Sequence, residues 1–268
     1  MSTIQIDAEE IALEVLNAFD TGESIQPFSA RGGPSLADAY GVTAAIRGQR
    51  EARGETHAGR KIGFTNRTIW PIYNVDGPIW GDMWDRTVFN LTEGSEFSVD
   101  GLHEPRIEPE IAFCLARSPE PGMDDATLLA CCEWVAHCVE IVQSPYPGWK
   151  FQAPDTVCAG GLHGALLLAK RRVVTPDLLG PLGGFTCTLM RDGVEVETGS
   201  SENVLGGPLK ALSHLVGLLA GDEINPPLGR GEIITTGTLT DAYPIAPGES
   251  WSTRLQGFDL PSVSIAFV

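Results

Sequence analysis

From Gly59 to the C-terminus, the sequence is a series of short apolar segments separated by glycine and proline. Segments of this length and composition are typical of strands, and the glycines and prolines mark the turns between them. The segments are GRKIGFT, RIEPEIAFCLA, WVAHCVEIVQ, HGALLLAK, FTCTLMRDGVEVETG, GEIITTGTL and PSVSIAFV. Asp192-Gly193 within the fifth segment predicts a hairpin turn. So many strands with few helices between them predict an α+β chain around a curved mixed sheet or barrel.

Helical patterns occur near the N-terminus and in one later segment. Apolar side chains in residues 11–19 recur with i, i+4 spacing, and Ser35 is a suitable N-cap for a second helix. A third helix is predicted over residues 207–221, between a Gly-Pro start and a closing glycine. We therefore expect a small helical part over residues 1–58 and a β-rich domain over residues 59–268.

The composition limits the possible partners. The chain carries 18 lysines and arginines against 35 aspartates and glutamates, a net charge of −17, which disfavours binding to nucleic acid or to an anionic membrane surface. No apolar run approaches the roughly 20 residues of a membrane-spanning helix, and the acidic N-terminus lacks the features of a signal peptide. We therefore expect a cytoplasmic protein whose six cysteines stay reduced, and Cys131, Cys132 and Cys138, which lack CxxC spacing, are expected to pack in the core rather than bind zinc.

The segment PRIEPEIAF, residues 105–113, holds two glutamates in an otherwise apolar strand pattern. Residues at i and i+2 of a strand point to the same face, so Glu108 and Glu110 are expected side by side. Burial of two like charges is unfavourable unless something compensates them. Pro109 between them cannot donate a ladder hydrogen bond, which predicts an edge position or a bulge.

Glu140 is a third carboxylate in an apolar strand, because WVAHCVEIV is apolar on both faces. A buried carboxylate needs a partner. Three convergent carboxylates without a basic partner for each favour a hard divalent cation, Mg²⁺ or Mn²⁺, which prefers oxygen ligands. The alternative is that Glu108 and Glu110 line a solvated face and that Glu140 pairs with a lysine. The spacing of Glu108 and Glu110 alone favours this alternative.

Four further polar residues lie in apolar or glycine-rich surroundings. Lys61, in GRKIGF, is either a surface lysine of a strand or a functional cation. Lys150 and Asp155, in GWKFQAPDTV, could form a structural ion pair. His163, in GGLHGA, is either a hydrogen-bonded turn residue or an acid/base group, for which the pKa range of histidine is suitable.

The segment around Gly237 supplies hydroxyl groups. Thr236 and Thr238 could hydrogen-bond a carboxylate or satisfy the end of a strand. The sequence has no nucleophile elbow, HExxH motif or dinucleotide-binding fingerprint. A redox nucleotide is therefore disfavoured.

Taken in order along the chain, several segments resemble the 2-keto-4-pentenoate hydratase and 4-oxalocrotonate decarboxylase family of the fumarylacetoacetate hydrolase superfamily. These segments are GRKIGFT, NVDGPIWG, PRIEPEIAF, the strand of Glu140, WKFQAPDTV, NVLGGPLKAL and GEIITTGTL. The helical N-terminal part also fits. The resemblance implies a fumarylacetoacetate hydrolase-like mixed β-roll or barrel with a small helical N-terminal part, assembled as a homo-oligomer.

The resemblance also implies a metal site for a small 2-oxo acid. Glu108, Glu110 and Glu140 would hold Mg²⁺ or Mn²⁺. The cation would chelate the carboxylate and the 2-oxo or 2-enol oxygen of the substrate and stabilise its enolate. Lys61 would lie near the substrate, where it binds the anion or, with a lowered pKa, moves a proton.

Further residues are placed on the pocket wall by the same resemblance. Lys150 and Asp155 would lie there. Trp80 belongs to a group of aromatic residues at the corresponding place in the sequence, namely Trp70, Tyr73, Trp80 and Trp84, which would either contact the substrate or pack in the core. Aromatic residues on the wall would suit a substrate that is larger or more aromatic than a simple pentadienoate.

The chain departs from the family pattern at two places. Ile79 stands where the family has an aspartate associated with proton handling. Where the family reads approximately DTVADNAS, this chain reads DTVCAGGLH, so Ala159 and Gly160 replace an Asp-Asn pair and a serine is lost. His163, next to these positions, is a candidate for a replacement acid/base group.

We therefore expect a divalent-metal-dependent hydratase or lyase that acts on a 2-oxo acid or its enol tautomer, such as a 2-hydroxy-2,4-dienoate. Two alternatives use the same metal site, namely decarboxylation of a 2-oxo diacid and hydrolytic C–C cleavage of an acylpyruvate. A third alternative is a catalytically silent homologue that binds a ligand or partner subunits, because the expected aspartate and serine are missing.

Overall fold

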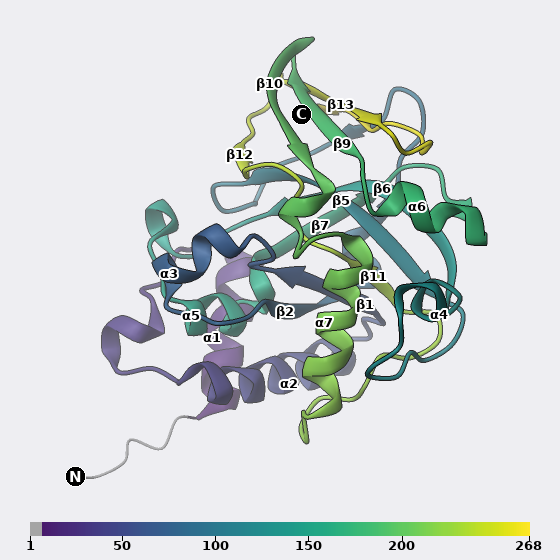
Figure 1. The fold of residues 1–268 in the computed structure, drawn as a ribbon. Helices are drawn as coiled ribbons and strands as arrows, with labels where there is room; N and C mark the ends of the chain where they lie inside the picture. The colour runs from purple at the N-terminus through teal and green to yellow at the C-terminus, as the bar shows by residue number, and fades with distance from the viewer. Residues whose placement is uncertain (1–6) are drawn as a thin grey trace.

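The computed structural model describes residues 7–268, which form two β-sheets with helices packed around them (Figure 1). The α-helices are α1 (Ala8–Thr21), α2 (Leu36–Ala52), α3 (Trp70–Tyr73), α4 (Asp125–Leu129), α5 (Ala153–Cys158), α6 (Leu179–Leu182) and α7 (Pro208–Ala220). The strands are β1 (His57–Gly63), β2 (Ile79–Trp84), β3 (Val88–Asn90), β4 (Glu96–Phe97), β5 (Arg106–Leu115), β6 (Cys132–Val142), β7 (His163–Leu168), β8 (Arg172–Val173), β9 (Thr186–Arg191), β10 (Val194–Ser200), β11 (Ile233–Thr235), β12 (Tyr243–Pro244), β13 (Ser250–Gln256) and β14 (Ser264–Phe267). Short 3₁₀ turns are η1 (Phe28–Arg31), η2 (Arg67–Ile69), η3 (Asp85–Thr87), η4 (Pro147–Trp149), η5 (Gly160–Leu162), η6 (Pro176–Leu178) and η7 (Ser201–Asn203).

The larger sheet has nine strands in the order β2-β1-β11-β5-β6-β7-β3, with β12 beside β5 and β8 beside β6. β1 is parallel to β11 and β3 is parallel to β7, whereas the other pairs in this sheet are antiparallel. The smaller sheet has the order β10-β9-β13-β14-β4. This mixed pairing confirms the predicted α+β class.

Several predicted elements are found where the sequence indicated them. α7 begins after Gly207 and ends at Gly221, and the side chain of Ser35 caps the start of α2. Asp192 and Gly193 both have positive φ in the turn between β9 and β10. This is the geometry that an Asp-Gly hairpin turn requires.

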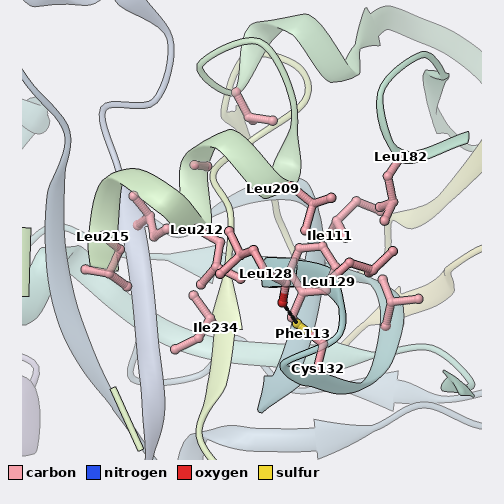
Figure 2. Close-up of a cluster of buried hydrophobic side chains, with 14 of the residues drawn as sticks. Ile111, Phe113, Leu128, Leu129, Cys132, Leu182, Leu209, Leu212, Leu215 and Ile234 are labelled. Carbon is pink, nitrogen blue, oxygen red and sulfur yellow. Dashed lines mark hydrogen bonds between the residues drawn. The ribbon is translucent and has the colours of Figure 1, made fainter. Parts of the chain in front are cut away.

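α7 covers one face of the larger sheet. Figure 2 shows Leu209, Leu212 and Leu215 of α7 in one cluster with apolar side chains of β5 and β11, among them Ile111 and Ile234. Full burial of an aliphatic side chain of this size contributes about 1.5–3 kcal/mol. Because alternate residues of a strand face opposite sides, the residues on either side of Ile111 are directed away from α7.

The N-terminal helices form a second layer. α1 and α2 pack against each other and against α5, with Val15, Leu16, Val42 and Val157 buried between them. α2 ends at Ala52 and β1 begins at His57, close to the change at residue 59 that the sequence indicated. The division into a helical part and a β-rich domain stays a prediction.

Pro109 lies in an interior strand, so the expected edge position is wrong, but the expected irregularity is present on one side, where the β11 ladder ends at Ala112 and the β12 ladder begins at Ile107. β5 pairs with β6 in regular register through Pro109 and beyond. The carbonyl of Pro109 accepts a hydrogen bond from the N–H of Leu239, so the side of Pro109 without an N–H faces residues 236–242 rather than β6. β11 has ended and β12 has not begun in that stretch. No ladder partner therefore requires the missing donor.

Within residues 7–268, no helix combines the length and the apolar character needed to cross a membrane. All six cysteines are free and buried. Cys132 and Cys187 pack in the cluster beneath α7, as expected for cysteines that fill the core.

Candidate active site

The structure brings Glu108, Glu110 and Glu140 together on the face of the larger sheet that is turned away from α7. Glu108 lies directly opposite Glu140 in the β5–β6 pairing, and Glu110 lies opposite Cys138. One carboxylate oxygen from each glutamate lies within 4.8 Å of the others. Glu110 and Glu140 are fully buried. Strand pairing thus assembles the three carboxylates that the sequence singled out.

Lys61 reaches Glu140 because the sheet is curved. β11 and β5 lie between β1 and β6 in the strand order, which would separate β1 from β6 by about 14 Å in a flat sheet. The Nζ atom of Lys61 nevertheless lies 3.1 Å from Oε2 of Glu140. The curvature therefore turns a lysine of a distant strand into a direct partner of the carboxylate.

His163 holds the other oxygen of Glu140. Its Nδ1 atom lies 2.8 Å from Oε1 of Glu140, and its Nε2 atom lies 2.9 Å from the hydroxyl of Thr87. Because a carboxylate only accepts hydrogen bonds, Nδ1 carries the proton of this contact. His163 is thus a hydrogen-bond donor to Glu140.

Burial and mutual repulsion make the three carboxylates unequal. Burial, together with the charge of Glu140, raises the pKa of Glu108 to about 7, against the opposing effect of Lys61. Burial and the two neighbouring glutamates raise the pKa of Glu110 well above its ordinary value. Burial also acts to raise the pKa of Glu140, but Lys61 and His163 outweigh it and hold that pKa below its ordinary value.

Lys61 is a charged ammonium group in this arrangement. Burial acts to lower its pKa, but the carboxylates of Glu140, Glu108 and Glu110 outweigh burial and hold the pKa above its ordinary value. The expectation of a lysine with a lowered pKa is therefore wrong for the site without a bound ion. The direction of the shift is that of a lysine facing several anions.

The donor set fits a hard divalent cation. Oε1 of Glu110 is buried and has no hydrogen-bond partner, although buried polar atoms are normally paired. Lys61 brings one positive charge to three carboxylates. A divalent cation would balance the remaining charge and take the unpartnered oxygen as a ligand. A set made only of carboxylate oxygens suits Mg²⁺ or Mn²⁺.

The turn after β11 holds the second oxygen of Glu110. The N–H of Gly237 donates to Oε2 of Glu110 at 2.7 Å. Gly237 has a φ of +92°, and a Cβ at this position would collide with the side chain of Thr65. Thr236 is fully buried, and its hydroxyl donates to the backbone of β5, so it fixes the turn. Gly237 and Thr238 line the adjacent cavity.

A cavity of about 340 Å³ opens beside the glutamates. Its wall includes Lys61 and Glu108 from the site and Ile79 and Leu162 from the segments that depart from the family pattern. His163 is not part of this wall, so it reaches the site only through Glu140. A cavity of this volume is of the size of small-molecule sites.

Ile79 faces this cavity, and Trp80 does not. Residues of β2 alternate between the two faces, and Gly81 pairs with Lys61 on the cavity side. Trp80 is 2 % exposed, stacks on Tyr40 with a ring separation of 5.0 Å and is not part of the cavity wall. The structure thus places Trp80 in the core, the alternative that the sequence left open.

Lys150 and Asp155 also lie outside the cavity wall. Lys150 is exposed. Asp155 is fully buried and accepts hydrogen bonds from the N–H and hydroxyl of Ser29 at 2.9 and 2.6 Å and from the N–H of Gln152 at 2.7 Å. Asp155 therefore anchors η1 and the start of α5 instead of pairing with Lys150. Thr156, its neighbour, lines the cavity.

The glycine-rich segment that replaces the family's Asp-Asn pair packs tightly against the site. A Cβ on Gly161 would lie 2.7 Å from Cδ of Lys61, and φ at this glycine is +69°. A Cβ on Gly81 would collide with the carbonyl of Gly160. The position of Lys61 therefore depends on glycines, which have no side chain, at this contact.

The sequence did not indicate Arg106 or most of the aromatic residues that line the cavity. Phe64, Tyr73, Trp149 and Phe151 line the cavity together with Arg106. Arg106 does have a sequence signal, because it precedes Glu108 by two residues in a strand and so shares its face. The aromatic residues come from segments far apart in the sequence, and of these only Tyr73 belongs to the aromatic group that the sequence indicated.

The fold and the site together define a fumarylacetoacetate hydrolase-like protein. No family model matches the chain, but curated relatives match most of it. It is 33 % identical over 236 residues to a 4-oxalocrotonate decarboxylase of Pseudomonas sp. (strain CF600), covering 87 % of this chain and 86 % of the relative. It is 30 % identical over 230 residues to a 2-hydroxyhexa-2,4-dienoate hydratase of Comamonas testosteroni, covering 85 % and 86 %. The chain belongs to the 2-keto-4-pentenoate hydratase/4-oxalocrotonate decarboxylase family.

A solved structure shares the whole architecture. The 4-oxalocrotonate decarboxylase of Pseudomonas putida G7, complexed with magnesium and adipate, superposes with a TM-score of 0.89 at 29 % identity, covering 97 % of each chain. This match confirms the predicted fumarylacetoacetate hydrolase-like fold with its helical N-terminal part.

Proposed function

We propose that this protein is a metal-dependent lyase that acts on a 2-hydroxy-2,4-dienoate or its 2-oxo tautomer. The convergence of Glu108, Glu110 and Glu140 within 4.8 Å beside a cavity of about 340 Å³ carries the proposal. The two relatives described above are a hydratase and a decarboxylase, both of them lyases. The matching solved structure contains magnesium, which supports Mg²⁺ or Mn²⁺ as the cofactor.

In this proposal the three glutamates hold the divalent ion, which supplies a Lewis acid for the carboxylate and 2-oxo oxygens of the substrate. Lys61 and His163 fix Glu140, and the N–H of Gly237 fixes Glu110. Two of the three carboxylates are thus oriented by the protein before a ligand binds. Such preorganisation lowers the cost of rearrangement during the reaction.

Lys61 is the proton donor of the proposed site. Its Nζ lies 3.1 Å from Oε2 of Glu140, and its side chain lines the cavity. An ammonium group there binds an anionic substrate and delivers a proton to the carbon chain. Ile79 and Leu162 on the same wall keep bulk water away from that chain.

The make-up of the wall supports decarboxylation as a second candidate reaction. Hydration needs a group that positions water as well as one that transfers a proton to carbon. Among the described residues, the carboxylates that line the cavity are Glu108 and Asp241, and Ile79 stands where an acid was expected. In decarboxylation of a 2-oxo diacid, the C–CO₂ bond breaks, its electron pair enters the conjugated 2-oxo group, and one proton returns to carbon. Lys61 supplies that proton in the proposed scheme.

The test is a substrate screen with Mg²⁺ or Mn²⁺ and analysis of the products. A 4-hydroxy-2-oxo acid formed from a 2-hydroxy-2,4-dienoate shows hydration, and CO₂ formed from an unsaturated 2-oxo diacid shows decarboxylation. A second carboxylic acid formed from an acylpyruvate shows C–C hydrolysis. Activity that survives EDTA would overturn the metal site, and Mg²⁺ binding without turnover of any substrate would indicate a catalytically silent homologue.

A matched pair of variants sharpens this test. Glu110→Gln keeps the shape of the side chain but removes its charge, and we expect activity to fall by more than about 100-fold, beyond the 10–100-fold typical of outer partners of a metal site. Glu133→Gln is the control, because Glu133 is an exposed residue of β6, the strand that carries Glu140. Equal activity of the two variants would contradict the assignment.

We also propose that the protein is cytoplasmic and assembles as a homo-oligomer. Six free, buried cysteines suit a reducing compartment, and the resemblance to the family supports assembly. Light scattering of the purified protein tests the second point, and a monomeric mass would contradict it.

A further inference from the structure

The turn after β11, residues 236–241, both orients a carboxylate of the site and forms one side of the cavity. The N–H of Gly237 donates to Oε2 of Glu110 at 2.7 Å, and Thr238 and Thr240 line the cavity. A turn lacks the ladder of hydrogen bonds that a strand has, so its backbone groups depend on other partners. The groups that support this turn therefore affect both the glutamate and the cavity.

The larger sheet fixes two residues of this turn. The N–H and the hydroxyl of Thr236 both donate to the carbonyl of Ile111, at 3.1 and 2.9 Å. The N–H of Leu239 donates to the carbonyl of Pro109 at 2.8 Å. Both carbonyls belong to β5, the strand that carries Glu110. The carbonyl of Leu239 takes its partner from another part of the chain.

Asn203, at the end of η7, supplies that partner. Its Nδ2 atom donates to the carbonyl of Leu239 at 2.8 Å, and the amide NH₂ must face this atom because a carbonyl only accepts hydrogen bonds. Gly199 of β10 lies so close to the same carbonyl that a Cβ would be 1.8 Å from its oxygen. Leu239 is fully buried, so loss of the Asn203 amide would leave a buried carbonyl without this donor, which is unfavourable.

The segment that carries Asn203 also supports the other flank of Gly237. The N–H of Leu205 donates to the carbonyl of Thr65 at 3.1 Å, and the side chain of Thr65 packs against Gly237, where a Cβ would lie 1.9 Å from its Oγ1. Leu205 has a φ of +60°, in the left-handed region that non-glycine residues rarely occupy. Such strain persists only where the surrounding structure holds the residue. This segment therefore reaches the surroundings of Gly237 at two separate points.

We propose that Asn203 is a positioning residue of the metal site. Its amide fixes Leu239, and with it the turn that presents the N–H of Gly237 to Glu110. Asn203 does not line the cavity, so it acts on the site only through this turn. The inference rests on the proposed function, because it assigns Glu110 to a divalent ion, and it holds for hydration and for decarboxylation.

A different role for Asn203 would be to stabilise the fold without affecting the metal site. Loss of its hydrogen bond would then lower the free energy of unfolding and leave Mg²⁺ affinity unchanged in the folded protein. Ser35→Ala is the matched control for this role. Ser35 accepts a hydrogen bond from the N–H of Asp38 at the start of α2, away from the cavity wall, and loss of such a cap lowers stability.

The test is calorimetric titration of Mg²⁺ into the folded protein and its variants. Asn203→Asp keeps the shape of the side chain but has no N–H to donate. We expect it to lower Mg²⁺ affinity by about 3–10-fold, a smaller effect than the roughly 10–100-fold typical of a direct partner of a metal ligand. Asn203→His, which retains a donor close to the place of Nδ2, should recover part of the loss. Ser35→Ala should bind Mg²⁺ as the unmodified protein does.

The electron paramagnetic resonance spectrum of bound Mn²⁺ is the second measurement, because it reports how the ligands are arranged around the ion. The spectrum should change in Asn203→Asp and stay the same in Ser35→Ala. Unchanged Mg²⁺ affinity together with an unchanged Mn²⁺ spectrum in Asn203→Asp would overturn the inference and leave the proposed function standing. Binding of neither ion by the unmodified protein would overturn the proposed function and the inference with it.

Discussion

The imidazole of His163 lies 2.8 Å from the carboxylate of Glu140, so this histidine acts on the site through a glutamate and not from the cavity wall. Its second ring nitrogen lies 2.9 Å from the hydroxyl of Thr87. A neutral ring that donates from Nδ1 and accepts at Nε2 satisfies both contacts. These contacts suit a positioning role for His163 at Glu140, and the expected acid/base role of His163 stays a prediction.

Removal of the imidazole should weaken metal binding. We expect His163→Ala to lower Mg²⁺ affinity by about 10–100-fold, the usual effect of losing a hydrogen bond behind a metal ligand, as measured by calorimetric titration. His163→Asn, which retains a donor close to the place of Nδ1, should recover part of the loss. His214→Ala on the exposed side of α7 is the control. Unchanged Mg²⁺ affinity in His163→Ala would rule out the positioning role.

Mg²⁺ should stabilise the folded protein. An ion that binds only the folded state raises the free energy of unfolding by about 2.7 kcal/mol at 100 times its Kd, which denaturant unfolding with and without Mg²⁺ measures. Glu110→Gln should abolish most of this increase, and Glu133→Gln should preserve it. An increase that is the same in both variants would place the ion elsewhere on the protein.

Replacement of Gly161 should disturb Lys61. The new Cβ of Gly161→Ala would lie 2.7 Å from Cδ of Lys61, at a φ of +69°. We expect a loss of about 1–3 kcal/mol in the free energy of unfolding and a fall in activity. Gly180→Ala is the control, because a Cβ at this position would meet no atom within 4 Å beyond its own helix backbone and its chain neighbours. Full activity of Gly161→Ala would show that the position of Lys61 is not critical.

His137 should make stability depend on pH. Burial lowers its pKa to about 4, whereas an unfolded histidine has a pKa of about 6.5. The unfolded state therefore binds more protons between these values. The contribution of neutral His137 to the free energy of unfolding, about 3 kcal/mol relative to low pH, is fully present above the unfolded pKa. It is lost as pH falls towards 4, and about 2 kcal/mol of it is lost by pH 5.

The measurement compares unfolding by urea at about pH 7.5 and pH 5 in the unmodified protein and in His137→Gln. The comparison isolates the histidine, because the buried glutamates titrate in both proteins. The difference in free energy of unfolding between the two proteins should shrink at the lower pH. A difference that is the same at both pH values would contradict the lowered pKa.

The sequence was most informative where a local pattern determines structure. The hairpin at Asp192-Gly193, the Ser35 cap and the bounds of α7 depend on neighbouring residues and were predicted correctly. β13 was missed because Thr253, a polar residue, occupies one of its buried positions. Its side chain is satisfied by His137, which no local pattern reveals.

The sequence predicted the part of the site that the side-chain alternation of two strands determines. The i, i+2 spacing gives Glu108 and Glu110 a common face, but the approach of Lys61 depends on the curvature of the sheet. The sequence left the place of Trp80 open, and alternation in β2 turns Trp80 away from the cavity and Ile79 towards it. The same spacing gives Arg106 the face of Glu108, but its contact with Trp149 joins it to a distant loop that no local pattern reveals.

Pro109 affects how the strands assemble as well as how they pair. Pairing of β11 with β5 runs from Ile233 to Thr235, and beyond it a strand that tried to extend the ladder would meet a residue with no N–H to offer. The N–H of Gly237, in the turn that follows β11, donates instead to the carboxylate of Glu110. A misaligned β11 that slid along β5 during folding would reach the same obstacle. The proline between the two glutamates therefore limits how far β11 can extend its ladder along β5, next to the turn that holds the carboxylate of Glu110.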